Sequence, residues 1–122
     1  EELRLEIDHD STVKLTVVGG DAEVFGTELA VDKAYTFTGC MLPVFSWHGC
    51  KVKVVGKCHA YVASETPMWK YLNAHGGLHQ RRLEAEKSDK HEGPRVLVVG
   101  PVDTGKTSIC KILCSYACRQ GF

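Results

Sequence analysis

Residues 100–107 read GPVDTGKT, which matches the pattern G-x-x-x-x-G-K-[ST] of the phosphate-binding P-loop. In this motif the glycines let the backbone fold tightly, so that successive N–H groups point inward and surround phosphate oxygens. These groups lie at the start of the following helix, where the helix dipole favours negative charge. A chance match in a chain of this length has odds of roughly one in 200 to 300. The stretch therefore predicts a nucleotide-phosphate site.

Two side chains of the motif have predicted roles at that site. Lys106 would place a full positive charge between the β- and γ-phosphates, which makes it the candidate catalytic residue. Thr107 would ligate Mg²⁺ through its hydroxyl, because this hard cation takes oxygen ligands. The motif does not specify a reaction, since P-loop proteins hydrolyse ATP or GTP, transfer phosphoryl groups, or only bind nucleotide.

The residues on both sides of the motif predict a strand and a helix. Residues 96–99 are four consecutive apolar residues, a pattern typical of a strand that is buried on both faces in a parallel sheet. From Lys106 to about Cys118, apolar residues recur with a helical period. We therefore expect residues 95–122 to be the first strand, P-loop and helix of an incomplete α/β domain.

Residues 1–65 predict a small antiparallel β-sandwich. Apolar and polar residues alternate in residues 3–7 and 13–17, and this period of two is typical of a half-buried strand. Further β-branched and aromatic runs follow, with turn signals about every 8–12 residues, so we expect six or seven short strands. Phe45 and Trp47 alternate in one of these runs, and we expect both in the core.

The hydrophobic period changes after the predicted sandwich. Thr66 is a good helix N-cap and Pro67 suits the first helical position, so a helix is expected to begin here. Gly76-Gly77 is expected to interrupt this helix or weaken it by about 1 kcal/mol per glycine. We expect residues 66–94 to be a connecting helix and a polar linker, which makes the whole chain mainly β.

Charge and composition exclude several classes of protein. The chain has 15 Lys plus Arg against 15 Asp plus Glu, so bulk electrostatics gives no reason to expect nucleic-acid binding. No apolar run approaches the roughly 18 residues needed to cross a bilayer, and we expect a soluble protein without a membrane partner. Cys110, Cys114 and Cys118 recur on one helical face, which favours free thiols in a reducing compartment over a disulfide scaffold.

The spacing of the cysteines also argues against a single-metal site. Cys110 and Cys118 would lie about 12 Å apart along a helix axis. If Gly56-Lys57 is a hairpin turn, Cys50 and Cys58 lie roughly 17 Å apart. One zinc ion with bonds of about 2.3 Å cannot take both thiols of either pair, so we expect them to be packing residues.

Beyond the motif, the chain resembles a known family over essentially all of its 122 residues. The resemblance rests on residues 2–4, 22–29, 44–50 and 66–68, together with the GPRV stretch and the P-loop that follow. The chain is similar to the N-terminal part of the eukaryotic polyribonucleotide 5′-hydroxyl kinases. These kinases belong to pre-mRNA cleavage complex II and associate with the tRNA-splicing endonuclease.

The resemblance implies a β-sandwich, a P-loop kinase domain and a C-terminal domain, with the nucleotide, ATP, bound between the first two and the sandwich helping to recognise adenine. It implies that Glu2 contacts the nucleotide, because Glu2 occupies the family's acidic position ahead of Leu-Arg in the first strand. The implied phosphate-binding residues are Asp103, Thr104, Gly105, Lys106, Thr107 and Ser108. The implied partners are RNA 5′ ends, bound through the C-terminal part, and other subunits of the 3′-end cleavage factor and of the tRNA-splicing endonuclease. The implied location is the nucleus.

The roles of two residues at the nucleotide site have alternative interpretations. Without the resemblance, Glu2 would be interpreted as a solvated charge on an edge strand. Met41 departs from the family, which usually has a lysine there that helps to hold the nucleotide. Methionine removes one positive charge and three hydrogen-bond donors from that position.

Two main hypotheses about function follow from the motif and the resemblance. The first is an ATP-dependent kinase of RNA 5′-hydroxyl ends that is active as the full-length protein, whereas this part alone is expected to be inactive. The second is a non-catalytic assembly subunit of the 3′-end processing complex that holds ATP as a structural element. Bound ATP would then stabilise the folded state without turnover. An unrelated P-loop NTPase with an added β-domain is the third alternative.

Overall fold

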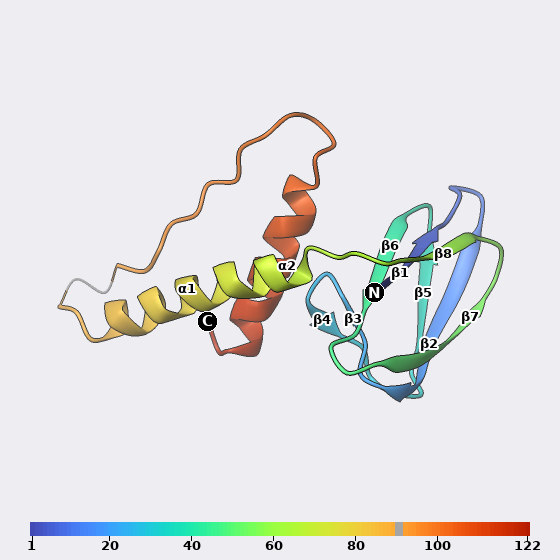
Figure 1. Ribbon diagram of the computed structural model, residues 1–122, viewed down its shortest axis with the longest axis horizontal. Coiled ribbons are helices and arrows are strands. Elements are labelled where there is room, and N and C mark those ends of the chain that lie inside the picture. The colour runs from blue at the N-terminus through green and yellow to red at the C-terminus, as the bar shows by residue number, and fades with distance from the viewer. Residues whose placement is uncertain (90–91) are drawn as a thin grey trace. The chain divides into compact units, whose positions relative to one another are not determined.

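The computed structural model describes residues 1–89 and 92–122, and the chain divides into two compact units (Figure 1). The first unit is Glu1–Thr66 and the second is Pro67–Phe122. Within the described residues, no helix has the length and apolar character needed to span a membrane.

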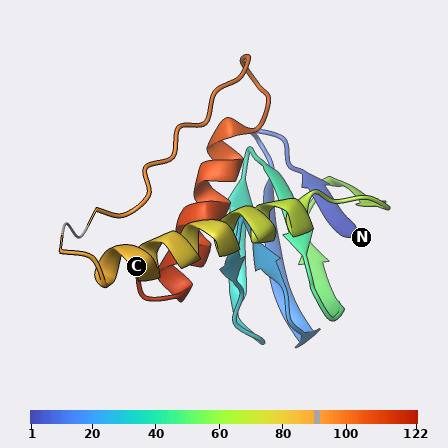
Figure 2. The same cartoon turned by 60° about the vertical axis from the view of Figure 1, so that its left-hand side comes forward.

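The first unit is a β-sandwich of two antiparallel sheets (Figures 1 and 2). The described residues form eight strands rather than the six or seven expected, and the predicted antiparallel sandwich is confirmed. The five-stranded sheet has the order β4 (Thr27–Glu28), β3 (Glu23–Val24), β6 (Met41–Phe45), β1 (Glu2–Glu6), β8 (His59–Ala63). The three-stranded sheet has the order β5 (Ala34–Thr38), β2 (Thr12–Gly20), β7 (Cys50–Val55).

The core of the sandwich lies between the two sheets and is built by the alternating residues of β1 and β2. The side chains that are fully excluded from solvent are Leu5, Val13, Leu15 and Val17. Successive residues of a strand point to opposite faces, so the period of two in the sequence puts these apolar side chains on the inner face. Burial of each such side chain stabilises the fold by about 1.5–3 kcal/mol.

Strands β7 and β8 belong to different sheets, so the expected hairpin at Gly56-Lys57 is wrong. β7 pairs with β2 in one sheet, whereas β8 pairs with β1 in the other. The connection passes close to the backbone of β2: Gly56 has φ +130°, and a Cβ there would lie 2.4 Å from the Thr12 carbonyl oxygen. Glycine allows this crossing at a conformation that other residues rarely adopt. The estimate of roughly 17 Å between Cys50 and Cys58 therefore rested on a pairing that does not form.

Trp47 also departs from the expectation that it lies in the core with Phe45. The Phe45 side chain is buried, but Trp47 is 39% exposed and touches the Phe45 ring edge-on at a centroid distance of 4.7 Å. Strand β6 ends at Phe45, so the strand alternation does not extend to Trp47. Trp47 therefore packs on Phe45 and does not belong to the hydrophobic cluster between the sheets.

The second unit consists of two helices that pack against each other, α1 (Met68–Glu86) and α2 (Lys106–Arg119) (Figure 2). Helix α1 is continuous through Gly76-Gly77, so the expected interruption is wrong. Both glycines face open space, and the turns on either side are held by ring contacts of His75 with Tyr116 and of His79 with Phe122. These contacts offset the cost of glycine in a helix, which is about 1 kcal/mol each.

The N-cap position of helix α1 falls on Pro67, one residue after the expected Thr66. Pro67 makes no side-chain capping bond, and the Thr66 hydroxyl donates to Oε2 of Glu2 at 2.9 Å. A bond to a carboxylate is stronger than one to a neutral backbone group, so Glu2 is a strong acceptor for this hydroxyl.

The strand predicted for residues 95–100 is absent, and this part of the expectation is wrong. These residues have no regular secondary structure, and Leu97 and Val99 are 86% and 81% exposed. A strand needs a neighbouring strand for its N–H and C=O groups, and the described residues of the second unit include none. The predicted α/β domain is thus represented by the P-loop and helix α2 alone.

A pH dependence is expected for the helix pair because His75 is buried between the two helices. The centroid of its ring lies 5.5 Å from the centroid of the Tyr116 ring and 5.9 Å from that of the His79 ring. Burial lowers the pKa of His75 below its ordinary value of 6.5, and the positive charges of Arg82 and His79 lower it further. The neutral ring therefore stabilises the fold fully above pH 6.5, and this stabilisation is lost as the pH falls from there through the folded-state pKa.

Thermal melts followed by helical circular dichroism at pH 7.5 and pH 5 test this expectation. The Tm should decrease more between pH 7.5 and pH 5 in the wild type than in His75→Gln, because the glutamine side chain does not titrate. The control His9→Gln replaces an exposed histidine and should keep the wild-type difference. Equal losses in all three proteins would show that His75 does not control the pH dependence.

Candidate nucleotide-binding site

The P-loop forms a closed turn immediately before helix α2. The Thr104 hydroxyl donates to the Pro101 carbonyl oxygen at 2.9 Å, and the Lys106 ammonium donates to the same oxygen. Two backbone conformations in the left-handed region reverse the chain, at Asp103 (φ +58°) and Gly105 (φ +80°). A Cβ on Gly100 would lie 3.2 Å from the Thr104 hydroxyl oxygen, so glycine permits the closed turn.

The start of helix α2 offers unpaired backbone donors. Its N-cap is Gly105, which has no side chain to cap the helix, and no acidic residue lies in the first turn. The first helical bond runs from the Ile109 N–H to the Gly105 carbonyl at 3.0 Å. The N–H groups of residues 106–108 precede this bond, and such groups have no partner inside a helix. Together with the helix dipole, they make a local environment that favours an anion.

The two side chains of the motif differ in their surroundings. The Lys106 stem is half-buried and its ammonium rests on the loop, whereas the Thr107 side chain is exposed at the first turn of α2. The described residues contain no group of three or more His, Cys, Asp or Glu side chains that could hold a metal ion.

Glu2 lies in the first unit and is not the solvated edge charge that its sequence position suggested. Strand β1 is central, between β6 and β8, and Glu2 is only 6% exposed. Its Oε1 accepts a hydrogen bond from Nε of Arg4 at 2.9 Å, and its Oε2 accepts one from the Thr66 hydroxyl at 2.9 Å. Bonding to the Glu2 carboxylate, and secondly to Tyr61, raises the pKa of Arg4.

Sequence reasoning missed these two partners of Glu2. The contact of Arg4 with Glu2 could have been predicted, because residues two apart in a strand point to the same face. The contact of Thr66 could not, because Thr66 is 64 residues away in the sequence and was interpreted as a helix cap. The structure brings residues 103–108 together around the helix start, and it holds Glu2 in a separate cluster on the outer face of its sheet.

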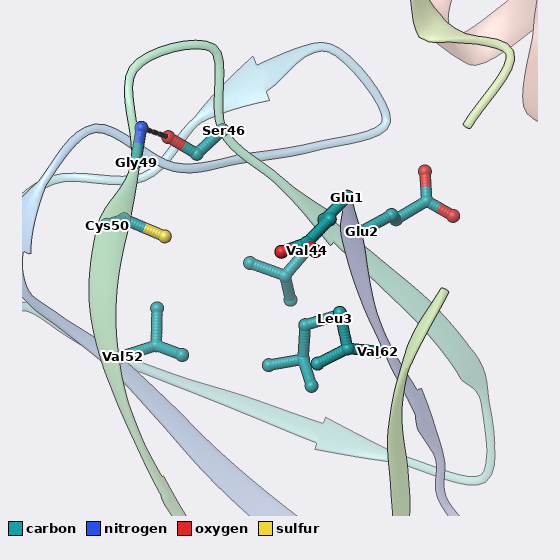
Figure 3. Close-up of a pocket in the computed structure, with 9 residues that line it drawn as sticks. All are labelled: Glu1, Glu2, Leu3, Val44, Ser46, Gly49, Cys50, Val52 and Val62. Atoms are coloured by element: carbon teal, nitrogen blue, oxygen red, sulfur yellow. Dashed lines mark hydrogen bonds between the residues drawn. The ribbon is translucent and has the colours of Figure 1, made fainter. Parts of the chain in front are cut away.

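A cavity of about 360 Å³ opens in the first unit, between the inner faces of the two sheets (Figure 3). Its lining combines four apolar side chains with polar residues and one glycine: Leu3, Val44, Val52 and Val62 together with Glu1, Glu2, Ser46, Gly49 and Cys50. Figure 3 shows the Glu2 side chain pointing away from the four apolar side chains.

Comparison with known proteins shows that the chain is similar to an mRNA cleavage and polyadenylation factor and to polyribonucleotide 5′-hydroxyl-kinases. A family model described as the N-terminal β-sandwich domain of polyadenylation factor matches residues 1–85. The chain is 48% identical over 120 residues to the mRNA cleavage and polyadenylation factor clp1 of Botryotinia fuckeliana, covering 98% of this chain and 26% of that protein. It is 48% identical over 122 residues to the polyribonucleotide 5′-hydroxyl-kinase Clp1 of Homo sapiens, covering 98% of this chain and 28% of that protein.

Solved structures are similar to nearly the whole chain, and two of them illustrate this similarity. The first is a structure of the extended interface between Pcf11p and Clp1p and of the basis for ATP loss in a point mutant. It matches with a TM-score of 0.80 and 31% identity over 97% of this chain. A structure of the wild-type Clp1p–Pcf11p complex matches with a TM-score of 0.76 and 32% identity over 94% of this chain. These matches cover 28% and 27% of the solved chains, so this chain spans little more than a quarter of the length of its relatives.

Proposed function

The chain belongs to the Clp1 family of mRNA cleavage factors and polyribonucleotide 5′-hydroxyl kinases, and from this premise we propose that the full-length protein is an ATP-dependent RNA 5′-hydroxyl kinase. The observation that carries the proposal is the uncapped start of α2, where a loop with two left-handed residues precedes Lys106. The domain division that goes with the proposal makes residues 1–65 the β-sandwich, residues 66–94 the connector and residues 95–122 the start of the kinase domain.

The P-loop residues fit a triphosphate bound with Mg²⁺. The backbone N–H groups of residues 103–108 would hold the phosphate oxygens, and Lys106 would leave the Pro101 carbonyl for the β- and γ-phosphates. Thr107 would ligate Mg²⁺ through its exposed hydroxyl, and Glu2 would contact the adenine base. ATP supplies the phosphoryl group that is transferred. Because the relatives are much longer than this chain, we propose that the base and the RNA groove lie in the part of the protein that it does not cover.

A second candidate function is a subunit that holds ATP without turnover. The support is that one relative is named a cleavage and polyadenylation factor, and that both solved neighbours are complexes of Clp1p with Pcf11p. In either case we propose a Pcf11-like protein, RNA 5′ ends and subunits of the tRNA-splicing endonuclease as partners, and the nucleus as the location. Bound ATP would stabilise the subunit by about 2.7 kcal/mol at a hundredfold excess over its Kd.

An assay with the full-length protein separates the two functions. A 5′-hydroxyl RNA oligonucleotide is incubated with γ-labelled ATP and Mg²⁺, and the same oligonucleotide with a 5′-phosphate is the control. The kinase proposal predicts label on the first oligonucleotide only. ATP that stays bound without transfer would favour the assembly subunit, and a protein that neither binds nor transfers would contradict both.

Met41→Lys is expected to tighten the binding of ATP to the full-length protein. Met41 begins β6, is 75% exposed and pairs in register with Glu6, which places it on the same outer face as Glu2. A lysine there adds a positive charge and three donors, and we expect the Kd for ATP to fall roughly two- to fivefold, about 0.5–1 kcal/mol. Calorimetry measures the change. Met41→Gln adds polarity without charge and should stay near the wild-type Kd; equal tightening in both variants would contradict the electrostatic explanation.

A further inference from the structure

The two sheets of the sandwich differ in width, and this leaves one side of the first unit open. The five-stranded sheet ends in β8, and the three-stranded sheet ends in β7. Residues 56–58 join these two strands directly, and both strands line the cavity of Figure 3. The free edges of the two sheets therefore flank the same opening. Among the described residues, no strand continues the three-stranded sheet beyond β7.

The inner face of β8 is left without a cover at this opening. Val62 pairs in register with Leu3, which lines the cavity. Ala60 pairs in register with Leu5, which is fully buried in the core. Because residues opposite each other in a sheet share a face, Val62 and Ala60 belong to the inner face. Val62 is nevertheless 62% exposed, and Ala60 is exposed as well. A further strand beside β7 would extend the smaller sheet over them.

The free edge of β7 can accept such a strand. β7 pairs with β2 on one side only, so its other side presents backbone N–H and C=O groups to solvent. An extended peptide can bond these groups and so add itself to the sheet. Figure 3 shows Cys50 and Val52 of β7 facing the cavity from the side opposite Leu3. Every second side chain of an added strand would point toward this inner side, and the others would point to the outer face.

The charges around β7 indicate which side chains the added strand carries. Lys51 and Lys53 are exposed on the outer face, and neither forms an ion pair within the part of the chain that the structure describes. Acidic residues opposite these lysines would each increase the affinity by a factor of roughly 1.5 to 5. On the inner side, Glu1 lines the cavity, so a second negative charge is disfavoured there. Apolar side chains suit the inner positions, where they would cover Val62.

A second copy of the chain fits this edge poorly. Pairing of two β7 strands about a twofold axis would bring Lys51 and Lys53 of both copies together on one face, and like charges in such positions are destabilising. We propose that the free edge of β7 is a docking site for an extended segment of a partner protein, with apolar residues at alternate positions and acidic residues between them. The site lies in the first unit and does not depend on the proposed nucleotide site of the second.

The test uses a fluorescein-labelled peptide of alternating glutamate and valine, and fluorescence anisotropy gives its Kd for the full-length protein. A peptide of alternating lysine and valine should bind at least tenfold more weakly. The double variant Lys51→Glu with Lys53→Glu should raise the Kd of the glutamate peptide roughly tenfold and should prefer the lysine peptide. Val62→Asp puts a charge where an apolar side chain would pack, and it should raise the Kd by a similar factor.

A matched control separates docking from damage to the fold. Val31→Asp also introduces a charge at a half-exposed valine, but Val31 bridges Val17 on the side of β2 that faces away from β7. It should keep the wild-type Kd, and a thermal melt of each variant shows that the fold is intact. Hydrogen–deuterium exchange locates the bound peptide: residues 50–55 should gain protection. Strand β5, the other edge of the same sheet, should not.

Several results would overturn the proposal. Absence of binding by the glutamate peptide up to about 1 mM would do so, as would a wild-type Kd in Val62→Asp or equal binding of the lysine peptide. Stronger protection of β7 than of β5 before any peptide is added would show that the protein's own chain covers the edge. A dimer of the full-length protein that the peptide dissociates would identify a second copy as the occupant. None of these results bears on the proposed kinase function, because the P-loop lies in the second unit.

Discussion

Lys106→Ala in the full-length protein is expected to remove nearly all transfer of the γ-phosphoryl group from ATP to RNA 5′-hydroxyl ends. The substitution removes the positive charge that the P-loop would bring to the β- and γ-phosphates, and negative charge there must be stabilised in the transition state. Removal of one such group typically costs about 2.7–4 kcal/mol, so the rate should fall by a factor of roughly 10² to 10³. Transfer of label from γ-labelled ATP to a 5′-hydroxyl oligonucleotide measures the loss.

Two further variants make this result specific. Lys106→Arg keeps the charge with a different shape and should recover only part of the rate, because arginine and lysine are not interchangeable at such sites. Lys87→Ala removes an exposed lysine at the end of α1 and should leave the rate unchanged. A wild-type rate in Lys106→Ala would show that the assigned role of Lys106 is wrong.

Leu15→Ala is expected to destabilise the β-sandwich by about 2–5 kcal/mol. Leu15 is fully buried in the middle of β2, where it pairs in register with Tyr35 on β5 and Val54 on β7. Alanine would leave a cavity between the sheets, and the neighbouring strands cannot close it without disturbing their own hydrogen bonds. Urea unfolding followed by the fluorescence of Trp47, with Trp69 replaced by phenylalanine in all proteins, measures the change.

Val55→Ala is the matched apolar control for the Leu15 variant. Val55 lies at the end of β7 and is 52% exposed, so its truncation should cost less than about 1 kcal/mol. Similar losses in the two variants would mean that the core does not lie between β2 and the facing sheet.

The alternating stretches of the sequence predicted the core well because strand alternation is a local property. Residues 3–7 and 13–17 alternate between apolar and polar, and Leu5, Val13 and Leu15 are fully buried. No knowledge of the partner strand is needed to assign the inner face of such a segment. The P-loop is similar: its turn and the start of α2 depend on consecutive residues, so the motif was sufficient to predict them.

The features that the sequence did not predict depend on residues that are far apart in the chain. Gly56 suggested a hairpin, but its connection crosses from one sheet to the other beside Thr12. Thr66 suggested a helix cap, but its hydroxyl bonds Glu2 at the other end of the first unit. Residues 96–99 suggested a buried strand, yet burial needs neighbouring strands that the described part of the second unit does not contain.

The candidate site likewise has one part that depends on consecutive residues and another that depends on residues far apart in the chain. The phosphate-binding half could be located from the motif alone, whereas Glu2 was located only through the resemblance and its partners only through the structure. Arg4 lies on the same strand face as Glu2, so a same-face search along the first strand would have found it.

Hydrogen–deuterium exchange of the full-length protein, measured with and without ATP and Mg²⁺, tests most directly whether the P-loop holds the nucleotide. The backbone N–H groups of residues 103–108 are expected to gain protection, because phosphate oxygens would accept hydrogen bonds that the helix leaves unmade. The predicted result is slower exchange in the peptide that covers this loop, lost again in Lys106→Ala. Unchanged exchange at saturating ATP would contradict the account.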